Sequence, residues 1–410
     1  MKKIPVFVFL SLALSVCFVH AEGQPTPISS PEDLFYLAEN PDGDFVLTED
    51  IYLPHVEKGG FEWVPPVFRG HLDGQGHTIY NASNYGLCKE TRTVYDGNYK
   101  EYDGYFAGFF GILDGAVVEN LNLVGASVLV YDSDLCAFAS PFAGLMENGA
   151  IVRNCSVEGI GTLTTSGHCF GIGGFAGYGS GRIESSSADV ELCCVDTDVE
   201  YKDEQFLGGA YSAGFIDLVD CDVKIDGYDS DHGYVHNGGL VGMYIIYPRG
   251  TSYAGSIVND HVEGRIRFFE DNRDRRAYCA PYIGEVLQWT YDWGGCTENF
   301  ERDEVFTYDE ILMPCRDGSV FRTEQVVEPD YGVQGYREQT CTQCGYTYRF
   351  DYKAPLRQEI QLLDEEPLRQ AVEAAQKSQT KQLPVVPLIG AGACVLLLIA
   401  LFALRKKGKH

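Results

Sequence analysis

The chain is short of positive charge. It has 31 lysines and arginines against 59 aspartates and glutamates, which gives a formal net charge of -28. A surface this acidic repels phosphate backbones and anionic lipid head groups, so we exclude nucleic acid as a partner. The same surface favours solubility and the attraction of cations.

Zinc-peptidase chemistry has no motif in this sequence. The string His-Glu-x-x-His is absent, and the nearest approximation, His232-Gly-Tyr-Val-His236, contains a glycine and lacks the glutamate. We interpret these two residues as loop histidines. No histidine lies between His261 and His410, so a metal site in that region must use cysteines or carboxylates.

Both ends of the chain carry targeting signals. Residues 1–21 combine two lysines, an apolar run and small residues before Ala21, which is typical of a cleaved signal peptide. Residues Val385 to Leu404 contain no charge and match the length needed to cross a hydrocarbon core of ~30 Å. The basic string RKKGKH follows directly, so we expect a transmembrane helix over 383–404, a cytoplasmic tail over 405–410 and an extracellular N-terminal bulk.

Between these ends the chain repeats itself. Segments of similar pattern recur at intervals of 31 to 39 residues, each with alternating apolar positions that predict a strand. Glycine-aromatic patches such as FAGFFG (106–111) precede most of them, and no helical stretch of ordinary length lies between them. The segments are TIYNAS (78–83), VENLNL (118–123), VRNCSV (152–157), IESSSA (183–188), LVDCDV (218–223) and IVNDHV (257–262).

Such a period leaves two all-β architectures, a parallel β-helix with one repeat per coil or a propeller with one blade per repeat. A blade needs four strands and each repeat shows two or three, so we predict a β-helix over 22–305. Its coils would stack one polar residue per repeat at a turn, where side chains bond unpaired backbone groups: Asn81, Asn120, Asn154, Ser185, Asp220 and Asn259. The next, inward file would be Leu121, Cys155, Ser186, Cys221 and Asp260.

The start of the mature chain predicts a short capping helix. Ser30 and Pro31 precede an amphipathic turn or two in which Leu34, Leu37 and Ala38 share one side. A β-helix has an open end whose apolar stack needs a cover. We therefore expect this helix to close the N-terminal end.

The segment FRGHLDGQGHTIYN (68–81), together with FVLTEDIYL (45–53) before it, resembles the start of bacterial surface proteins that carry the glycine-rich GLUG motif. GGFAGYGSGRIESS and GGLVG further along are similar to the repeat itself, and the resemblance covers about residues 28–270. Such regions accompany immunoglobulin-A-peptidase-like and adhesin-like proteins of Gram-positive bacteria. The resemblance implies a right-handed parallel β-helix on a cell-surface protein, and it brings no catalytic residues.

Two groups of residues are candidates for metal ligands. Asp226, Asp229 and Asp231 could give calcium three oxygens from one loop, although we favour a solvated loop between coils over a site. Residues 306–355 form a small cysteine-containing β module that resembles the TCxxCGY segments of Firmicute surface proteins. Its Cys315, Cys341 and Cys344 would hold zinc only with a fourth cysteine, Cys296 or Cys279, and a disulfide or free thiols are the alternatives. His71 and His77 are turn residues rather than ligands in this interpretation.

The sequence thus predicts a membrane-anchored surface protein. A polar helical stalk over 356–382 would carry the β-helix, which acts as an adhesive platform for a host or cell-wall glycan or a protein. The alternative is a glycan-active enzyme, a polysaccharide lyase or glycoside hydrolase, which would need close carboxylates that the sequence does not reveal. Trp289 and Trp293 are candidates for stacking on sugars or for packing over the C-terminal end of the coils.

Overall fold

The computed structural model describes most of the chain between residues 24 and 356. The predicted signal peptide, stalk, transmembrane helix and cytoplasmic tail lie outside the described residues. Among those that are described, no helix is long and apolar enough to span a membrane. The described ranges are 24–54, 63–84, 86–95, 100–133, 135–196, 204–229, 234–244, 255–269, 278–280, 283–286, 291–294, 297–306, 322–341 and 347–356.

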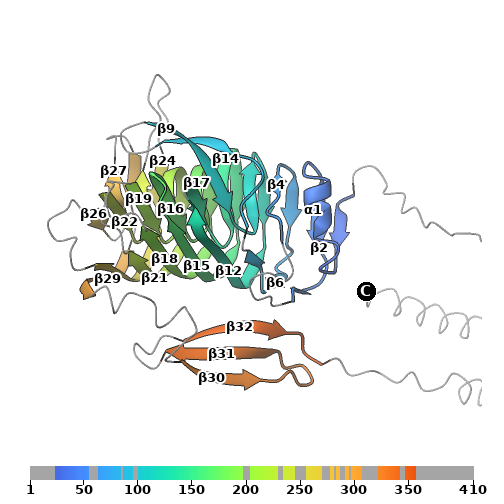
Figure 1. Cartoon of the computed structure of the whole chain (residues 1–410). Coiled ribbons are helices and arrows are strands. Elements are labelled where there is room, and N and C mark those ends of the chain that lie inside the picture. Colours follow the sequence, from blue (N-terminus) through green and yellow to red (C-terminus); the bar gives the residue numbers. More distant parts are fainter. Residues whose placement is uncertain are drawn as a thin grey trace, which may run out of the picture. The chain divides into compact units, whose positions relative to one another are not determined.

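Three parallel sheets run along the molecule, and successive coils add one strand after another to each (Figure 1). Sheet A contains β1 (Thr26–Ile28), β2 (Asp44–Leu47), β4 (Val67–Phe68), β5 (His71–Asp73), β10 (Phe110–Asp114), β11 (Val117–Glu119), β14 (Ala143–Arg153), β17 (Ala176–Glu184), β20 (Tyr211–Val219), β23 (Val241–Tyr244), β24 (Gly255–Val258), β27 (Ile283–Val286) and β28 (Tyr291–Gly294).

The other two solenoid sheets have the same construction. Sheet B contains β3 (Ile51–Tyr52), β6 (Thr78–Tyr80), β7 (Ser83–Asn84), β12 (Asn122–Ser133), β15 (Ser156–Thr165), β18 (Ser187–Asp196), β21 (Asp222–Asp229), β25 (His261–Phe269) and β29 (Thr297–Phe306). Sheet C contains β8 (Arg92–Tyr95), β9 (Glu101–Ala107), β13 (Cys136–Ala139), β16 (Cys169–Gly173), β19 (Glu204–Gly208), β22 (Tyr234–Gly238) and β26 (Tyr278–Ala280).

The predicted parallel β-solenoid is confirmed, and the propeller alternative is wrong, because equivalent strands of neighbouring repeats pair in parallel. Val118 pairs with Val152, Val152 with Ile183, Ile183 with Leu218, and Leu218 with Ile257. All five side chains are fully buried. Equivalent apolar residues of neighbouring coils thus stack at one strand spacing, about 4.8 Å. The stack gives the solenoid a continuous apolar interior that a single repeat could not form.

A file of left-handed residues marks the corner between sheets A and B. Asn120, Asn154, Ser185, Asp220 and Asn259 have φ angles of 55°, 50°, 49°, 55° and 59°. Such angles strain most side chains, but asparagine and aspartate tolerate them because the short polar group bonds locally. Asn154 Nδ2 donates to Asn120 Oδ1 at 2.6 Å, and Asn259 Nδ2 donates to Asp220 Oδ1 at 3.1 Å, so the file is also a hydrogen-bonded ladder.

Asn81 does not belong to this file, contrary to the prediction. Tyr80 pairs with Val124, which brings Asn81 opposite Gly125. The coil position equivalent to Asn120 is Gly74, whose N–H donates to a carbonyl oxygen of the next coil just as that of Asn120 does. The first coil has extra residues at this corner, where Gln75 and Gly76 have φ angles of 51° and 80°. The extra residues shift the TIYN segment relative to the repeat pattern of the later coils.

Sheet C and the sheet A strands β10, β14, β17, β20 and β23 enclose a second apolar cluster beside the main interior. Rings of Phe106, Phe138 and Phe206 stack at 6.4 Å between centroids, and His236 stacks on Phe206 at 5.3 Å. The interpretation of His236 as a loop histidine is therefore wrong: it lies in β22 and is 3% exposed. His232 lies outside the described residues.

The described cysteine side chains are core residues. None of the seven forms a disulfide, and all are buried: Cys88, Cys136, Cys155, Cys169, Cys193, Cys194 and Cys221. Cys155 and Cys221 donate weakly to backbone carbonyl oxygens, at 3.3 Å to Arg153 and 3.5 Å to Val219. Burial raises the pKa of both thiols to about 12, so they pack as small apolar groups.

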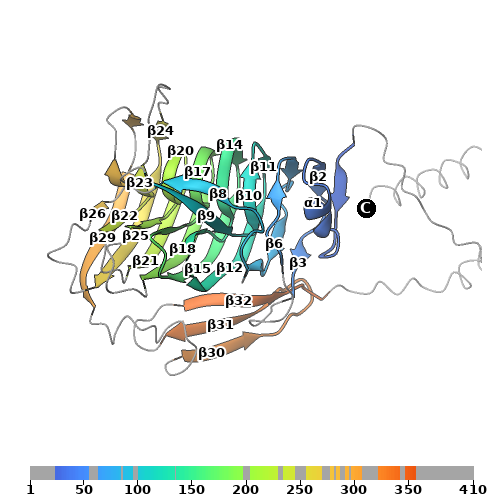
Figure 2. The same cartoon turned by 45° about the horizontal axis from the view of Figure 1, so that its top comes forward.

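The described ends of the solenoid differ from its middle. The helix α1 (Phe35–Glu39) lies beside β2 at the end where the chain begins (Figure 2), and Leu34 and Leu37 are fully buried in the main core. Ser30 Oγ accepts from the N–H of Asp33 at 3.2 Å. At the same end β8 pairs antiparallel with β9 and closes the edge of sheet C.

A separate antiparallel sheet follows the solenoid. Sheet D consists of β30 (Arg322–Val327), β31 (Gly335–Cys341) and β32 (Thr347–Lys353), within the predicted cysteine-containing module. Cys341 ends β31, while Cys315 and Cys344 lie outside the described residues. The zinc or disulfide alternatives for this module therefore stay predictions.

Candidate functional site

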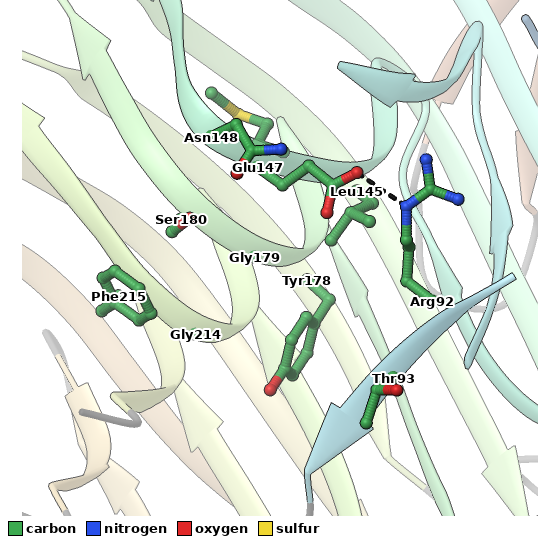
Figure 3. A pocket seen from close by; sticks show the side chains of 11 residues that line it. Arg92, Thr93, Leu145, Glu147, Asn148, Tyr178, Gly179, Ser180, Gly214 and Phe215 are labelled. Atoms are coloured by element: carbon green, nitrogen blue, oxygen red, sulfur yellow. Dashed lines mark hydrogen bonds and ion pairs between the residues drawn. The ribbon is translucent and has the colours of Figure 1, made fainter. Parts of the chain in front are cut away.

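A small pocket opens on sheet A, where strand β8 passes over three successive coils (Figure 3). Its volume is about 170 Å³, smaller than the sites that take drug-sized ligands. The lining comes from β8, β14, β17 and β20 and the bend within β14: Arg92, Thr93, Leu145, Met146, Glu147, Asn148, Tyr178, Gly179, Ser180, Gly214 and Phe215.

Two glycines let the coils approach closely enough to form the floor. Gly179 and Gly214 pair in register and have φ angles of 130° and 129°. A Cβ atom at Gly179 would lie 1.8 Å from the carbonyl oxygen of Met146, and one at Gly214 would lie 2.0 Å from that of Gly179. Only glycine fits either position, for reasons of both space and backbone angle.

A bulge in β14 supplies the polar rim. The register between β14 and β17 shifts between Met146 and Ala150, so Glu147, Asn148 and Gly149 form an excursion opposite β17. Asn148 and Gly149 have φ angles of 54° and 79°, which suit this residue pair in a tight turn. The bulge aims the Glu147 carboxylate toward Arg92 on β8, as Figure 3 shows.

Arg92 holds two carboxylates. Its Nε donates to Glu147 Oε1 at 2.8 Å, and its Nη1 donates to Glu90 Oε2 at 2.9 Å. Burial disfavours the charged guanidinium, but these hydrogen bonds outweigh it and raise the pKa of Arg92. Arg92 is therefore a fixed cation that ties the β8 hairpin to the solenoid.

A second ion pair lies in the neighbouring coil. Asp114 pairs in register with Glu147, and its Oδ2 accepts from Arg69 Nε at 3.2 Å while Oδ1 accepts from Asn148 Nδ2 at 2.7 Å. The two neighbouring carboxylates, Asp114 and Glu147, thus each have a guanidinium partner. Glu147 is the one carboxylate among the lining residues.

Three polar groups at the pocket keep hydrogen-bonding capacity. Arg92 Nη2, Asn148 Oδ1 and Ser180 Oγ make no hydrogen bond to any described residue. Together they offer donors and acceptors in a pocket that Leu145, Tyr178 and Phe215 also line. This combination suits a small polyhydroxylated ligand better than it suits proton-transfer chemistry.

The predicted metal ligands do not form a site within the described residues, where no group of three metal-binding side chains occurs. Asp226 lies in strand β21 instead of the predicted loop, and its Oδ2 accepts from Arg265 Nη2 at 3.3 Å. Asp229 ends that strand, and Asp231 lies outside the described residues. The calcium prediction is therefore untested for the loop itself.

The two histidines of the glycine-rich segment have carboxylate partners on neighbouring coils. His71 Nε2 lies 2.8 Å from Glu119 Oε1, and His77 Nδ1 lies 3.2 Å from Asp50 Oδ1. The backbone of Trp293 pairs opposite Ile257 in sheet A, and so continues the series of paired anchors that begins at Val118. Trp289 lies outside the described residues.

Sequence reasoning missed the pocket. Arg92, Tyr178 and Phe215 are scattered over 123 positions and share no motif. The one signal was the string Glu147-Asn148-Gly149, whose Asn-Gly pair marks a turn just before the VRNCSV repeat. This Asn-Gly pair could have predicted a bend in that coil.

Comparison with known proteins adds little. No family model matches the sequence, and no curated protein matches it. Three chains of solved structures match this chain, among them one titled "IgA1 Protease", with a TM-score of 0.45 and 17% sequence identity. That match covers 70% of this chain and 20% of the other, so this chain spans about a fifth of that protein's length.

Proposed function

We propose that this protein is a bacterial cell-surface protein, anchored by its C-terminal segment, whose β-solenoid binds a glycan without turning it over. The observation that carries the binding role is the pocket on sheet A, with its unused polar groups at Arg92, Asn148 and Ser180. The secretion signal and the uncharged stretch of the sequence support surface display.

The pocket chemistry favours a neutral sugar ring. The hydroxyl groups of a sugar can both donate and accept hydrogen bonds. They can therefore accept from Arg92 Nη2, donate to Asn148 Oδ1 and do either with Ser180 Oγ. An anionic ligand would meet Glu147 in the pocket and the net charge of -28 around it. A volume of about 170 Å³ suits one ring, with the rest of the glycan outside.

The binding role is tested on a glycan array with the full chain and two pocket variants. Asn148→Gly keeps the φ angle of 54° accessible and removes the amide, and Ser180→Ala removes the hydroxyl. Each should weaken binding about three- to tenfold, the worth of one hydrogen bond. Lys224→Ala, an exposed change on sheet B, serves as the control. Failure of the chain to retain any glycan, or equal binding by all variants, would contradict the role of this pocket.

Surface display has its own test. Intact cells that express the full chain are treated with an external protease, and the products are read by mass spectrometry. We expect cleavage within the solenoid and in sheet D, because both would face the medium. Complete protection until the cells are lysed would refute display.

A glycan-active enzyme is the second candidate, and the neighbouring carboxylates Asp114 and Glu147 are the observation that favours it. Glycosidases use two carboxyl groups flanking the scissile bond. Here each carboxylate already bonds an arginine, Arg69 or Arg92, so we rank catalysis second. Turnover of a bound glycan would reverse that order.

A further inference from the structure

An asparagine of the first coils, Asn81, hydrogen-bonds the backbone of sheet D. Asn81 Nδ2 donates to the carbonyl oxygens of Leu53 and Tyr352, both at 2.9 Å, and the N–H of Tyr352 donates to Asn81 Oδ1 at 2.9 Å. The amide group thus bonds the backbone of β32 as a neighbouring strand would, across 271 residues of sequence. This is the role of the asparagine that the repeat pattern misassigned.

A bend in β32 presents Tyr352 to that asparagine. Asp351 has a φ angle of 50°, and the register between β31 and β32 shifts between Gly335 and Arg337. A bulge of this kind turns the following residue away from its own sheet. Tyr352 therefore directs its backbone at Asn81 and its side chain at the solenoid.

The Tyr352 ring packs against two tyrosines of the first coils. It lies 5.4 Å from the ring of Tyr80, which stacks on Tyr52 at 4.4 Å. A Cβ atom at Gly125 would lie 2.9 Å from the Tyr352 ring, so the glycine leaves room for the ring. The Tyr352 hydroxyl donates to Glu158 Oε1 at 3.3 Å.

The described side chains of sheet D bury little apolar surface. Tyr352, at 7% exposure, is the one large apolar side chain that is buried among those described in β30, β31 and β32. Val326 is 49% exposed. A further hydrogen bond to the solenoid runs from Gln334 Nε2 to the Tyr52 hydroxyl, at 3.1 Å.

A three-stranded sheet without a core of its own is stable only when it is docked. By contrast, the solenoid strands next to it belong to an apolar core that continues through many coils. We propose that sheet D is a detachable clasp: it docks on the first coils through Asn81 and Tyr352, and it opens as a unit while the solenoid stays folded. This inference does not depend on the proposed function.

Hydrogen exchange of the full chain, read by mass spectrometry, tests the clasp. Asn81→Gly keeps the φ angle of 63° accessible and removes the amide, so amides of β31 and β32 should exchange at least tenfold faster than in the wild type. Amides of β17 and β20, in sheet A, should be unchanged. Tyr331→Ala, at a side chain of the same module that is 61% exposed, is the matched control and should change neither set.

Two further variants separate docking from general misfolding. Gly125→Ala should speed exchange in sheet D, because the added methyl displaces the Tyr352 ring, and amides of β12 report the strain that alanine adds at a φ angle of 64°. Tyr352→Phe should have a smaller effect of the same kind, since it loses only the bond to Glu158. Unchanged exchange in sheet D for Asn81→Gly, or one common exchange rate for sheet D and β17 in the wild type, would overturn the proposal.

Discussion

Replacing Asp260 with asparagine is expected to stabilise the protein at neutral pH and to change little in acid. Asp260 is a carboxylate in the interior file, 1% exposed. Its Oδ1 accepts from the N–H of Cys221 at 2.8 Å, and its Oδ2 has no hydrogen-bond partner among the described residues. Burial therefore disfavours the charged form and raises the pKa of Asp260 from its ordinary value of 3.8 to about 6.

The magnitude follows from linkage. Because the folded state holds the proton of Asp260 more tightly than the unfolded state, the contribution of Asp260 to stability is greatest below pH 3.8 and falls as the pH rises through about 6. Above that range the ionised Asp260 costs the fold about 3 kcal/mol. Asparagine has no charge to bury and keeps an acceptor for the Cys221 N–H, so it should recover about 2–3 kcal/mol at pH 7.5.

The assay is urea unfolding of the full chain at pH 4 and pH 7.5. Asp42→Asn, at a side chain that is 73% exposed, is the control and should change the unfolding free energy by less than about 0.5 kcal/mol. We expect the midpoint of the Asp260 variant to exceed that of the wild type at pH 7.5 and to match it at pH 4. An equal or lower midpoint at pH 7.5 would refute the assignment of Asp260 as an uncompensated buried charge.

Three other predictions test the packing. Gly179→Ala should lower the unfolding free energy by more than about 3 kcal/mol or yield insoluble protein, because its Cβ would lie 1.8 Å from a backbone oxygen. Gly149→Ala, with open space around it, should lower it by only about 1 kcal/mol. Urea unfolding compares the two variants. Cys155 and Cys221 should resist iodoacetamide at pH 8 and react after denaturation, because burial raises their pKa to about 12; native labelling would contradict this. Deletion of residues 22–54 should give insoluble protein by baring the first coil, and a soluble monomer would count against a capping role.

The repeating part of the fold was predictable from the sequence because its stabilising contacts are local and periodic. The anchors Val118, Val152, Ile183, Leu218 and Ile257 pair as their spacing indicated. The first coil was misaligned because it has two apolar positions that fit the pattern. Leu72 and Ile79 are both buried, and only the strand pairing shows that Leu72 is the partner of Val118.

The sites were less predictable, for a physical reason. The pocket depends on where a bulge in β14 brings Glu147 beside an arginine of β8, which is a matter of three-dimensional register. The clasp joins Asn81 to Tyr352 across 271 residues, and neither residue is unusual in its own segment. Short-range patterns carry no information about such contacts.

Mass analysis of a glycan after long incubation with the full chain tests the central claim most directly. The ligand retained on the array is held with the protein, recovered, and compared with the starting material and with material held with the Asn148→Gly variant. Binding without chemistry predicts an intact glycan, retained by the wild type and held more weakly by the variant. Any shorter, hydrolysed or unsaturated product that depends on the wild-type pocket would contradict it.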